Sequence, residues 1–380
     1  MSFSLLALVV LVGLLGPLLS ARAAWRIPVV IGELAGGLLI GISGLHLVDP
    51  TADEFRLLAN IGFGLTMVLV GSQVPVRDAA VRAALPRGLL GAVVVGIASA
   101  VLGVLIGAAF GTGHAAVYAV VFASSSAALV LPMLQSLGVR ATTVSPLVAQ
   151  IAIADIVCIV ALPLVIAPER ALAAGLAAAG IALAAAALVV VLTWLRRRNL
   201  RHRIHEYSER RRFALELRFS LLVLFAFAAI AQLANLSIML AGFALGLVLS
   251  LVGEPHRLAR QLFGITEGFF GPLFFVWLGA SLNLRDVAGN PQLILLGVAL
   301  GLGAVLAHLA ARAVGLPWLQ ALASAGQLGV PVAAVTLGIQ SSTLLPGEGS
   351  ALILGALLTV AVSAVATGAI ARRGSALSSP

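Results

Sequence analysis

The sequence predicts an all-α polytopic membrane protein with about 13 transmembrane helices. Of the 380 residues, 61% are hydrophobic and only 10% are charged, and the mean hydropathy is +1.14. Soluble domains are about 45–50% apolar and about 25% charged. Apolar stretches of about 17–25 residues, long enough to cross a bilayer as a helix, recur along the whole chain. A transmembrane β-barrel is excluded, because its strands alternate polar and apolar residues.

The apolar stretches give the expected helices in chain order. They span residues 4–20, 26–45, 54–73, 87–110, 115–137, 143–166, 170–195, 213–233, 235–252, 261–281, 291–314, 318–340 and 349–371. Gly is frequent, with 40 residues, and small residues favour close helix packing in lipid. The polar stretch 196–212 (RRRNLRHRIHEYSERRR) is expected to be a cytoplasmic linker.

The arginines predict the orientation of the chain in the membrane. All 23 basic residues are Arg, against 14 acidic residues. Only Arg56, Arg170 and Arg285 follow even-numbered helices. With Arg218 and Arg312 assigned to the nearby inner ends of their helices, the other 20 lie on the opposite side. Positive loops stay on the cytoplasmic side, which places the N-terminus outside and the C-terminus inside. These arginines lie beside membrane lipid rather than in a nucleic-acid site, despite the high pI.

Two of the expected helices are interrupted by polar residues and proline. Ser124–Ser126 and Pro132 interrupt the fifth helix, and the stretch 324–331 (SAGQLGVP) interrupts the twelfth. The freed backbone groups and hydroxyls can line a polar site within the membrane. The two helices are seven apart and enter from opposite sides, which predicts inverted repeats with two crossed discontinuous helices, 5 and 12. The alternative is two kinked helices that only pack.

Four ionisable residues lie deep in apolar spans: Glu33, Asp155, Glu267 and His308. Such residues are costly within a membrane and are rare without a function. Asp155, at the middle of the sixth helix, is the most isolated. In a low dielectric its carboxylate needs either a proton or a monovalent cation to balance its charge. A site that binds one or the other, but not both, is the minimum requirement of an antiporter. The alternative is an Asp that bonds the broken backbone of the fifth helix.

Further candidates for the site are His308 and Arg312 in the eleventh helix and Glu33 in the second. A histidine can change its charge near neutral pH or partner a carboxylate. Each candidate has a structural alternative. His308 can be a packing residue, Arg312 can extend to the membrane surface, and Glu33 can lie in a helix interface.

Six stretches resemble a known family: the bacterial cation–proton antiporters of the second branch, which includes sodium/proton exchangers and Kef-type potassium efflux systems. The stretches occur in the family's order over about 330 residues. They are IPVVIGELAGGLLIG (27–41), LVGSQVPVRD (69–78), SSSAALVLPMLQSLGV (124–139), IADIVCIVALPLV (153–165), LAGFALGLVLS (240–250) and GFFGPLFFVWLGASLNL (268–284).

The resemblance implies a single cation/proton exchanger domain over residues 1–380 in the bacterial cytoplasmic membrane. Its mobile core would contain helices 4–6 and 11–13, about 87–166 and 291–371, and its dimerisation part helices 1–3 and 8–10. The resemblance implies a homodimer in which Asp155 binds the proton or the transported cation, Na⁺ or K⁺, beside the hydroxyls of Ser125 and Ser126. The sequence contains no nucleophile–base–acid set, no metal-ligand spacing and no phosphate-binding loop, so neither an enzyme nor a cofactor is expected.

The chain departs from the electrogenic members of this family at four positions. Ala154 and His308 replace the first acid of the site and a Lys on the eleventh helix, and Gln327 and Gln73 replace acids of the twelfth and third helices. With one acid at the site, one-for-one electroneutral exchange is the expected stoichiometry.

Three other functions fit the sequence. One is a Kef-like gated potassium efflux pathway that needs a separate cytosolic regulatory subunit. Another is a sodium-coupled symporter for an organic solute, which would need more polar sodium ligands near the breaks than the sequence offers. The third is a degenerate homologue used for sensing or assembly, whose ion flux would not depend on Asp155.

Overall fold

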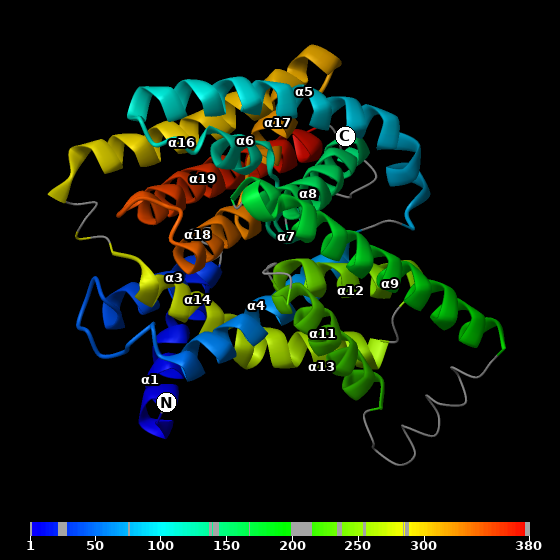
Figure 1. The fold of residues 1–380 in the computed structure, drawn as a ribbon. Coiled ribbons are helices and arrows are strands. Elements are labelled where there is room, and N and C mark those ends of the chain that lie inside the picture. Colours follow the sequence, from blue (N-terminus) through cyan, green and yellow to red (C-terminus); the bar gives the residue numbers. More distant parts are fainter. Residues whose placement is uncertain are drawn as a thin grey trace. The chain divides into compact units, whose positions relative to one another are not determined.

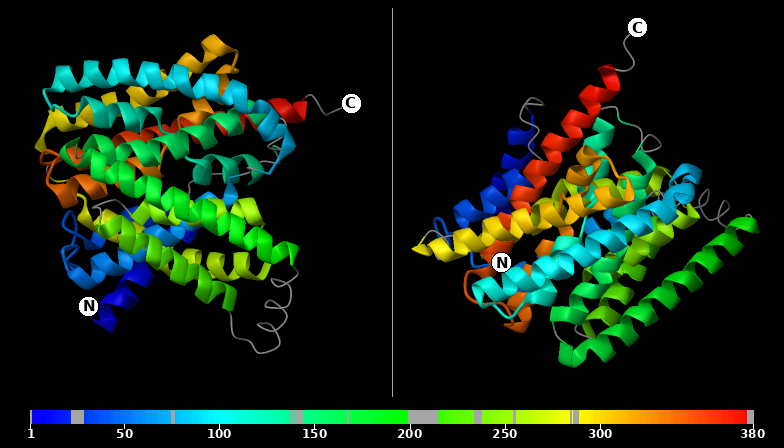
Figure 2. Two further views of the ribbon diagram at one scale, coloured as in Figure 1. Left: turned by 45° about the vertical axis from the view of Figure 1, so that its right-hand side comes forward. Right: turned by 90° about the horizontal axis from the view of Figure 1, so that it is seen from above.

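The computed structural model describes residues 2–21, 29–74, 77–136, 144–166, 168–198, 215–233, 238–253, 256–283 and 289–376, with Val139 and Arg285 as single residues. This described part is built from helices and contains no strand (Figures 1 and 2), which confirms the all-α prediction. Most of the expected linker at 196–212 lies outside the described residues, as do Arg22, Arg26 and Arg140.

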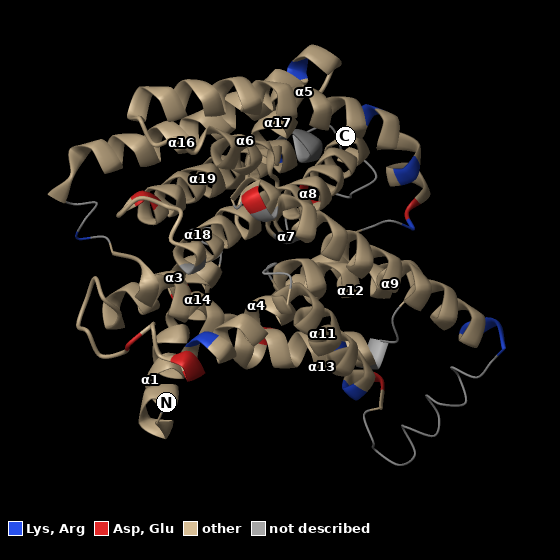
Figure 3. Cartoon of the chain, viewed as in Figure 1, with Lys and Arg blue, Asp and Glu red and all other residues tan. Residues whose placement is uncertain are grey.

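Within the described residues, ten helical stretches are long and apolar enough to cross a membrane. Two further apolar helices are shorter, Val29–Ile40 and Ile238–Val252, and the expected span 115–137 is divided in two. The 13 expected segments therefore all coincide with helical structure, while the number of membrane crossings stays a prediction. Figure 3 shows charged residues at few places along these helices.

The chain divides into two compact units, and unit 1 comprises Met1–Val74 and Leu172–Leu282. Its helices are α1 (Phe3–Gly13), α2 (Leu15–Ser20), α3 (Val29–Ile40), α4 (Asp53–Gln73), α9 (Ala171–Arg197), α11 (Leu215–Leu233), α12 (Ile238–Val252), α13 (His256–Ile265), the π-helical turn η3 (Thr266–Phe270) and α14 (Gly271–Ser281).

The helices of unit 1 approach each other at glycines. A Cβ at Gly242 of α12 would lie 2.2 Å from the carbonyl oxygen of Gly64 in α4. A Cβ at Gly37 of α3 would lie 2.1 Å from the carbonyl oxygen of Val276 in α14. These distances are shorter than any van der Waals contact, so only glycine permits this backbone packing.

Unit 2 comprises Pro75–Ala171 and Asn283–Pro380. Its helices are α5 (Ala79–Phe110), α6 (Ala115–Ala123), α7 (Ala127–Ser136), α8 (Ser145–Ile166), η2 (Pro168–Arg170), α16 (Pro291–Leu309), η4 (Ala310–Val314), α17 (Trp318–Ser324), α18 (Gly329–Ser341) and α19 (Glu348–Ala376). The long α5 packs along α6 and α8, and α16 packs along α19 (Figure 1).

Both predicted interruptions are present in unit 2. The first separates α6 from α7 at Ser124–Ser126, and the second separates α17 from α18 at residues 325–328. The prolines are not where the helices break. Pro331 lies in the first turn of α18, where a backbone N–H has no intrahelical partner, and Pro132 lies inside α7. The inverted repeats and the crossing of the two helices stay predictions.

Candidate ion-binding site

The first break is made by three consecutive serines. The backbone N–H and the hydroxyl of Ser124 both donate to the carbonyl of Val121, at 3.1 and 2.7 Å, and close the end of α6. The carbonyl of Ser126 accepts from the N–H groups of Leu129 and Val130 and so begins α7. All three serines are buried. Serine favours such helix ends because its hydroxyl competes with the helical backbone pattern.

The two breaks are hydrogen bonded to each other. The N–H of Ser126 donates to the carbonyl of Gly326 at 2.9 Å, and the hydroxyl of Ser125 donates to the carbonyl of Ser324. Backbone groups that leave a helix away from water need partners. Here each interruption supplies partners for the other, so the two broken helices share one buried polar cluster.

Asp155 reaches this cluster from α8. It is buried, and its Oδ2 accepts from the N–H of Ala127 at 3.2 Å. Ala127 is the first residue of α7, and the partial positive charge at a helix N-terminus stabilises a carboxylate. None of the basic side chains in the described ranges forms an ion pair with Asp155. The helix end therefore supplies only a partial charge to balance the carboxylate.

His308 of α16 connects both breaks from a fully buried position. Its Nε2 lies 3.0 Å from the carbonyl of Ser124, and its Nδ1 lies 2.9 Å from the hydroxyl of Ser324. Because a carbonyl only accepts, Nε2 carries a hydrogen. The hydroxyl of Ser324 also lies 2.8 Å from the carbonyl of Ala321, and the amide of Gln150 approaches it at 3.4 Å.

The single hydrogen of the Ser324 hydroxyl links the network to the charge on His308. With a neutral ring, that hydrogen serves either Nδ1 of His308 or the carbonyl of Ala321. With a protonated ring, Nδ1 donates to the hydroxyl and the hydroxyl donates to Ala321, so every group has a partner. A proton on His308 thus changes the hydrogen bonding of the second break.

Gln327 occupies the second break with its side chain directed at α6. Its Nε2 donates to the carbonyl of Phe122 at 3.3 Å, and its backbone N–H donates to the hydroxyl of Thr359 at 3.2 Å. Both groups of this buried residue therefore hold the broken backbone in place.

Sequence reasoning missed three polar residues of the cluster: Gln150, Thr359 and Ser363. The hydroxyl of Ser363 donates to the carbonyl of Ala323 at 2.7 Å. Thr359 and Ser363 are four residues apart and therefore share one face of α19. This spacing was the signal that could have found them.

Two sequence candidates lie outside the cluster. Arg312 is exposed in η4, at the end of α16. Glu33 is buried in α3 of unit 1. The structure thus brings together Asp155, Ser125, Ser126, His308 and Gln327, and leaves Arg312 and Glu33 elsewhere.

Most of the chain is similar to a family of sodium/hydrogen exchangers and to relatives named as Na(+)/H(+) antiporters. Residues 6–373 match the family model described as sodium/hydrogen exchanger, transmembrane. A relative named Probable Na(+)/H(+) antiporter 3, from Methanocaldococcus jannaschii, is 26% identical over 283 residues, which cover 73% of this chain and 71% of the relative. The Na(+)/H(+) antiporter NhaS5 of Synechocystis is 26% identical over 326 residues, 82% of this chain and 45% of NhaS5.

The fold is similar to a solved structure, that of the sodium proton antiporter MjNhaP1 from Methanocaldococcus jannaschii at pH 8. The TM-score is 0.68, with 95% of this chain and 94% of the other covered, at 17% sequence identity. At this identity the similarity demonstrates the fold alone.

Proposed function

The chain belongs to the sodium/hydrogen exchanger family, and from this premise we propose that it exchanges a monovalent cation for H⁺ across the cytoplasmic membrane by alternating access. The observation that carries the proposal is the placement of Asp155 at the N-terminus of α7, beside two hydrogen-bonded helix breaks. Na⁺ is the first candidate cation, because the named relatives are Na⁺/H⁺ antiporters, and K⁺ is the second.

Asp155 is the shared site in this mechanism. A proton neutralises its carboxylate in one state, and a partly dehydrated cation does so in the other. An ionised and empty site is the costliest form to move through a low dielectric. Exchange is therefore coupled, because the site crosses only when it is occupied.

The serines of the first break supply oxygen ligands, which suit hard monovalent cations. The hydroxyl of Ser125 donates a hydrogen bond to the carbonyl of Ser324, so the lone pairs of the Ser125 oxygen can coordinate a cation. Ser126 lies directly before Ala127, whose N–H holds Asp155. With Ala154 and Gln327 uncharged, one carboxylate carries one charge per cycle, and the exchange is electroneutral.

His308 is a neighbour of this site that can change its hydrogen bonds in our proposal. Its protonation completes the hydrogen bonds of Ser324 and adds a positive charge between the two breaks. Its role is to adjust the pH range of exchange rather than to carry the transported proton.

The test is cation-dependent proton flux in proteoliposomes with an imposed pH gradient, with Na⁺, K⁺ and Li⁺ compared. Asp155→Asn keeps the shape of the side chain but cannot exchange a proton, so flux should fall to background. The matched control is Asp78→Asn. Asp78 caps α5 by accepting from the N–H groups of Ala80 and Val81, and Asn caps a helix equally well. Normal flux in Asp155→Asn would overturn the proposal.

The assembly proposed for this multi-pass membrane protein is a homodimer formed through unit 1, with α3 in or near the interface and the core in unit 2. The N-terminus lies outside the cell. Native mass spectrometry that finds only monomers in mild detergent would contradict the dimer. The named relatives are antiporters and give the gated potassium pathway no support.

A further inference from the structure

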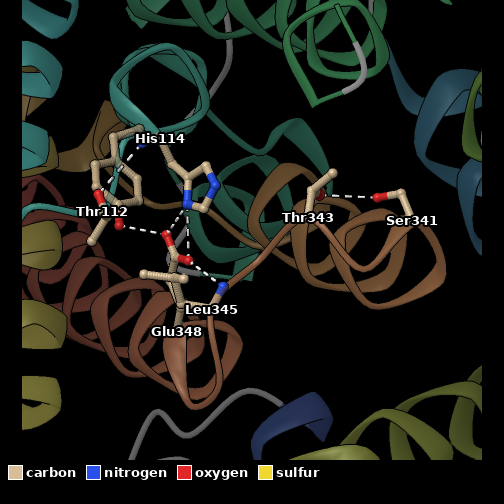
Figure 4. Close-up of polar contacts among 7 residues, drawn as sticks. Thr112, His114, Ser341, Thr343, Leu345 and Glu348 are labelled. Carbon is tan, nitrogen blue, oxygen red and sulfur yellow. Dashed lines mark hydrogen bonds and ion pairs between the residues drawn. The ribbon is translucent and has the colours of Figure 1, made fainter.

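A second buried carboxylate of unit 2 lies outside the candidate site, at the start of α19. Glu348 is 1% exposed, and three groups lie within hydrogen-bond distance of its carboxylate (Figure 4). The ring Nδ1 of His114 lies 2.8 and 2.9 Å from its two oxygens. The hydroxyl of Tyr118 donates to Oε1 at 2.5 Å, and the N–H of Leu345 donates to Oε2 at 2.8 Å.

The three side chains differ in their access to water. Tyr118 and Glu348 are buried, whereas the His114 side chain is 21% exposed. His114 lies directly before α6 and is the one member of the three that is partly exposed. A charged ring gives Glu348 an ion-pair partner, and a neutral ring leaves only neutral donors around a buried charge.

The network joins two helices whose other contacts hold the breaks. His114 precedes α6, and the same nine-residue helix ends at Ser124, the start of the first break. Glu348 begins α19, which later supplies Thr359 and Ser363 to the second break. A helix can transmit a displacement of one end to the other, so a change in the contact between His114 and Glu348 can reach both breaks.

Arg285 is two residues from Asn283, whose carbonyl accepts from the hydroxyl of Ser350 in the first turn of α19, and its guanidinium keeps its charge at every pH of the tests below. The titratable groups of the packed helices lie away from this network. Of the helices packed against α6 and α19, α7, α17 and α18 carry no charged or titratable side chain. Asp155, Cys158 and His308 on α8 and α16 lie at the breaks or one turn from them. The arginines of α5 and α19 lie at the far ends of those helices, at positions 82, 87, 372 and 373. The charge on His114 is therefore the charge near Glu348 that can change with pH.

We propose that His114, Tyr118 and Glu348 form a pH-sensitive clamp between the starts of α6 and α19. The clamp is closed when His114 is protonated, and it weakens when His114 loses its proton. On the expected orientation both helices begin on the outer side, so the clamp responds to external pH. The transport consequence rests on the proposed exchange function, whereas the clamp itself does not.

The first measurement is thermal unfolding of the full chain in detergent at about pH 5 and about pH 8.5, the two sides of the range in which histidines titrate. The unfolding midpoint of His114→Gln should lie several degrees below wild type at the lower pH and close to it at the higher pH. The matched control is His46→Asn, an exposed histidine at φ 56°, a backbone conformation that Asn tolerates. Its midpoint should follow wild type at both values.

Tyr118→Phe separates titration from simple hydrogen bonding. It removes one donor to Glu348 but no titrating group, so it should lower the midpoint at both pH values. This variant also keeps the test decisive if His114→Gln fails to fold, because a Tyr118→Phe midpoint equal to wild type would overturn the clamp. An equal deficit of His114→Gln at both pH values would overturn it too.

The second measurement is exchange in right-side-out and inverted membrane vesicles. Because H⁺ is itself a substrate of the proposed exchange, the rate depends on the pH of the outer compartment in both proteins. His114→Gln should shift the midpoint of that dependence relative to wild type while it keeps cation selectivity. An unaltered dependence in the variant would contradict the clamp. Absence of exchange in wild type would instead contradict the proposed function, and the unfolding measurement would still decide the clamp.

Discussion

Unit 1 and unit 2 bury their helices with different contacts. In unit 1 the backbones of α3 and α14, and of α4 and α12, touch at glycines such as Gly37 and Gly242. In unit 2 the helices around the breaks meet through hydroxyls, amides and an imidazole. Backbone contacts give a fixed interface with nothing to titrate, whereas the polar contacts of unit 2 can change with a proton or a cation.

The buried acids of the two units illustrate the same difference. Asp155 lies at a helix N-terminus within a polar cluster. Glu33 lies in α3, where a Cβ at Gly16 of α2 would come within 2.8 Å of its side chain, and the second carboxyl near it is that of Glu267. In the described residues no pair of hydrogen-bonded helix breaks adjoins Glu33, whereas such a pair adjoins Asp155, so our proposal places exchange at Asp155.

The largest expected effect is on the folding of unit 1. In Gly37→Leu a side chain would replace the contact with the carbonyl of Val276, where a Cβ already lies at 2.1 Å. Overpacking of this kind costs about 1–3 kcal/mol or more, so the unfolding midpoint in detergent should fall sharply. Gly96→Ala in α5, where the new Cβ meets nothing within 4 Å, is the control and should lose no stability. Equal midpoints for the two variants would contradict the backbone packing.

The next effect concerns the joined breaks of unit 2. Ser125→Ala removes the hydroxyl that bonds to Ser324 and a ligand of the proposed site. A lost hydrogen bond costs about 1 kcal/mol, and with the lost ligand we expect the exchange rate to fall about tenfold. Ser125→Thr keeps the hydroxyl and should retain most of the rate. An Ala variant that exchanges at the wild-type rate would place the cation elsewhere.

Local features of the sequence predicted the helices and the breaks. Apolar runs mark each helical segment, and Ser124–Ser126 marks the first interruption, because both signals lie within a few residues. The pairing of Ser125 with Ser324 joins residues 199 apart, and one sequence gives no signal for such a contact. For the same reason His308 was predicted as a candidate, but not as the bridge between both breaks.

A smaller effect is expected for His308. His308→Ala and His308→Gln both remove the titrating ring, and both should shift the pH profile of exchange without abolishing it. Gln keeps two hydrogen-bonding groups but does not titrate. If only His308→Ala shifted the pH profile, the role of His308 would be structural and its charge would not be involved. The measurement is the initial rate of proton flux across a series of pH values in proteoliposomes.

The smallest effect is expected for Arg312. This side chain is exposed in η4, and substitutions at such positions usually change stability by less than about 0.5 kcal/mol. Arg312→Gln should therefore leave both the unfolding midpoint and the exchange rate near wild type. A large loss of exchange with a normal midpoint would bring Arg312 back into the site.

The most direct test of the central claim is to count the protons released when the cation binds. Isothermal titration of the detergent-solubilised protein with Na⁺, in buffers of different ionisation enthalpy, measures this number. If one carboxylate holds either ion, wild type should release close to one proton per bound cation at a pH where Asp155 is protonated, and Asp155→Asn should release none. Cation binding by wild type without proton release, or unchanged release by Asp155→Asn, would contradict the shared site.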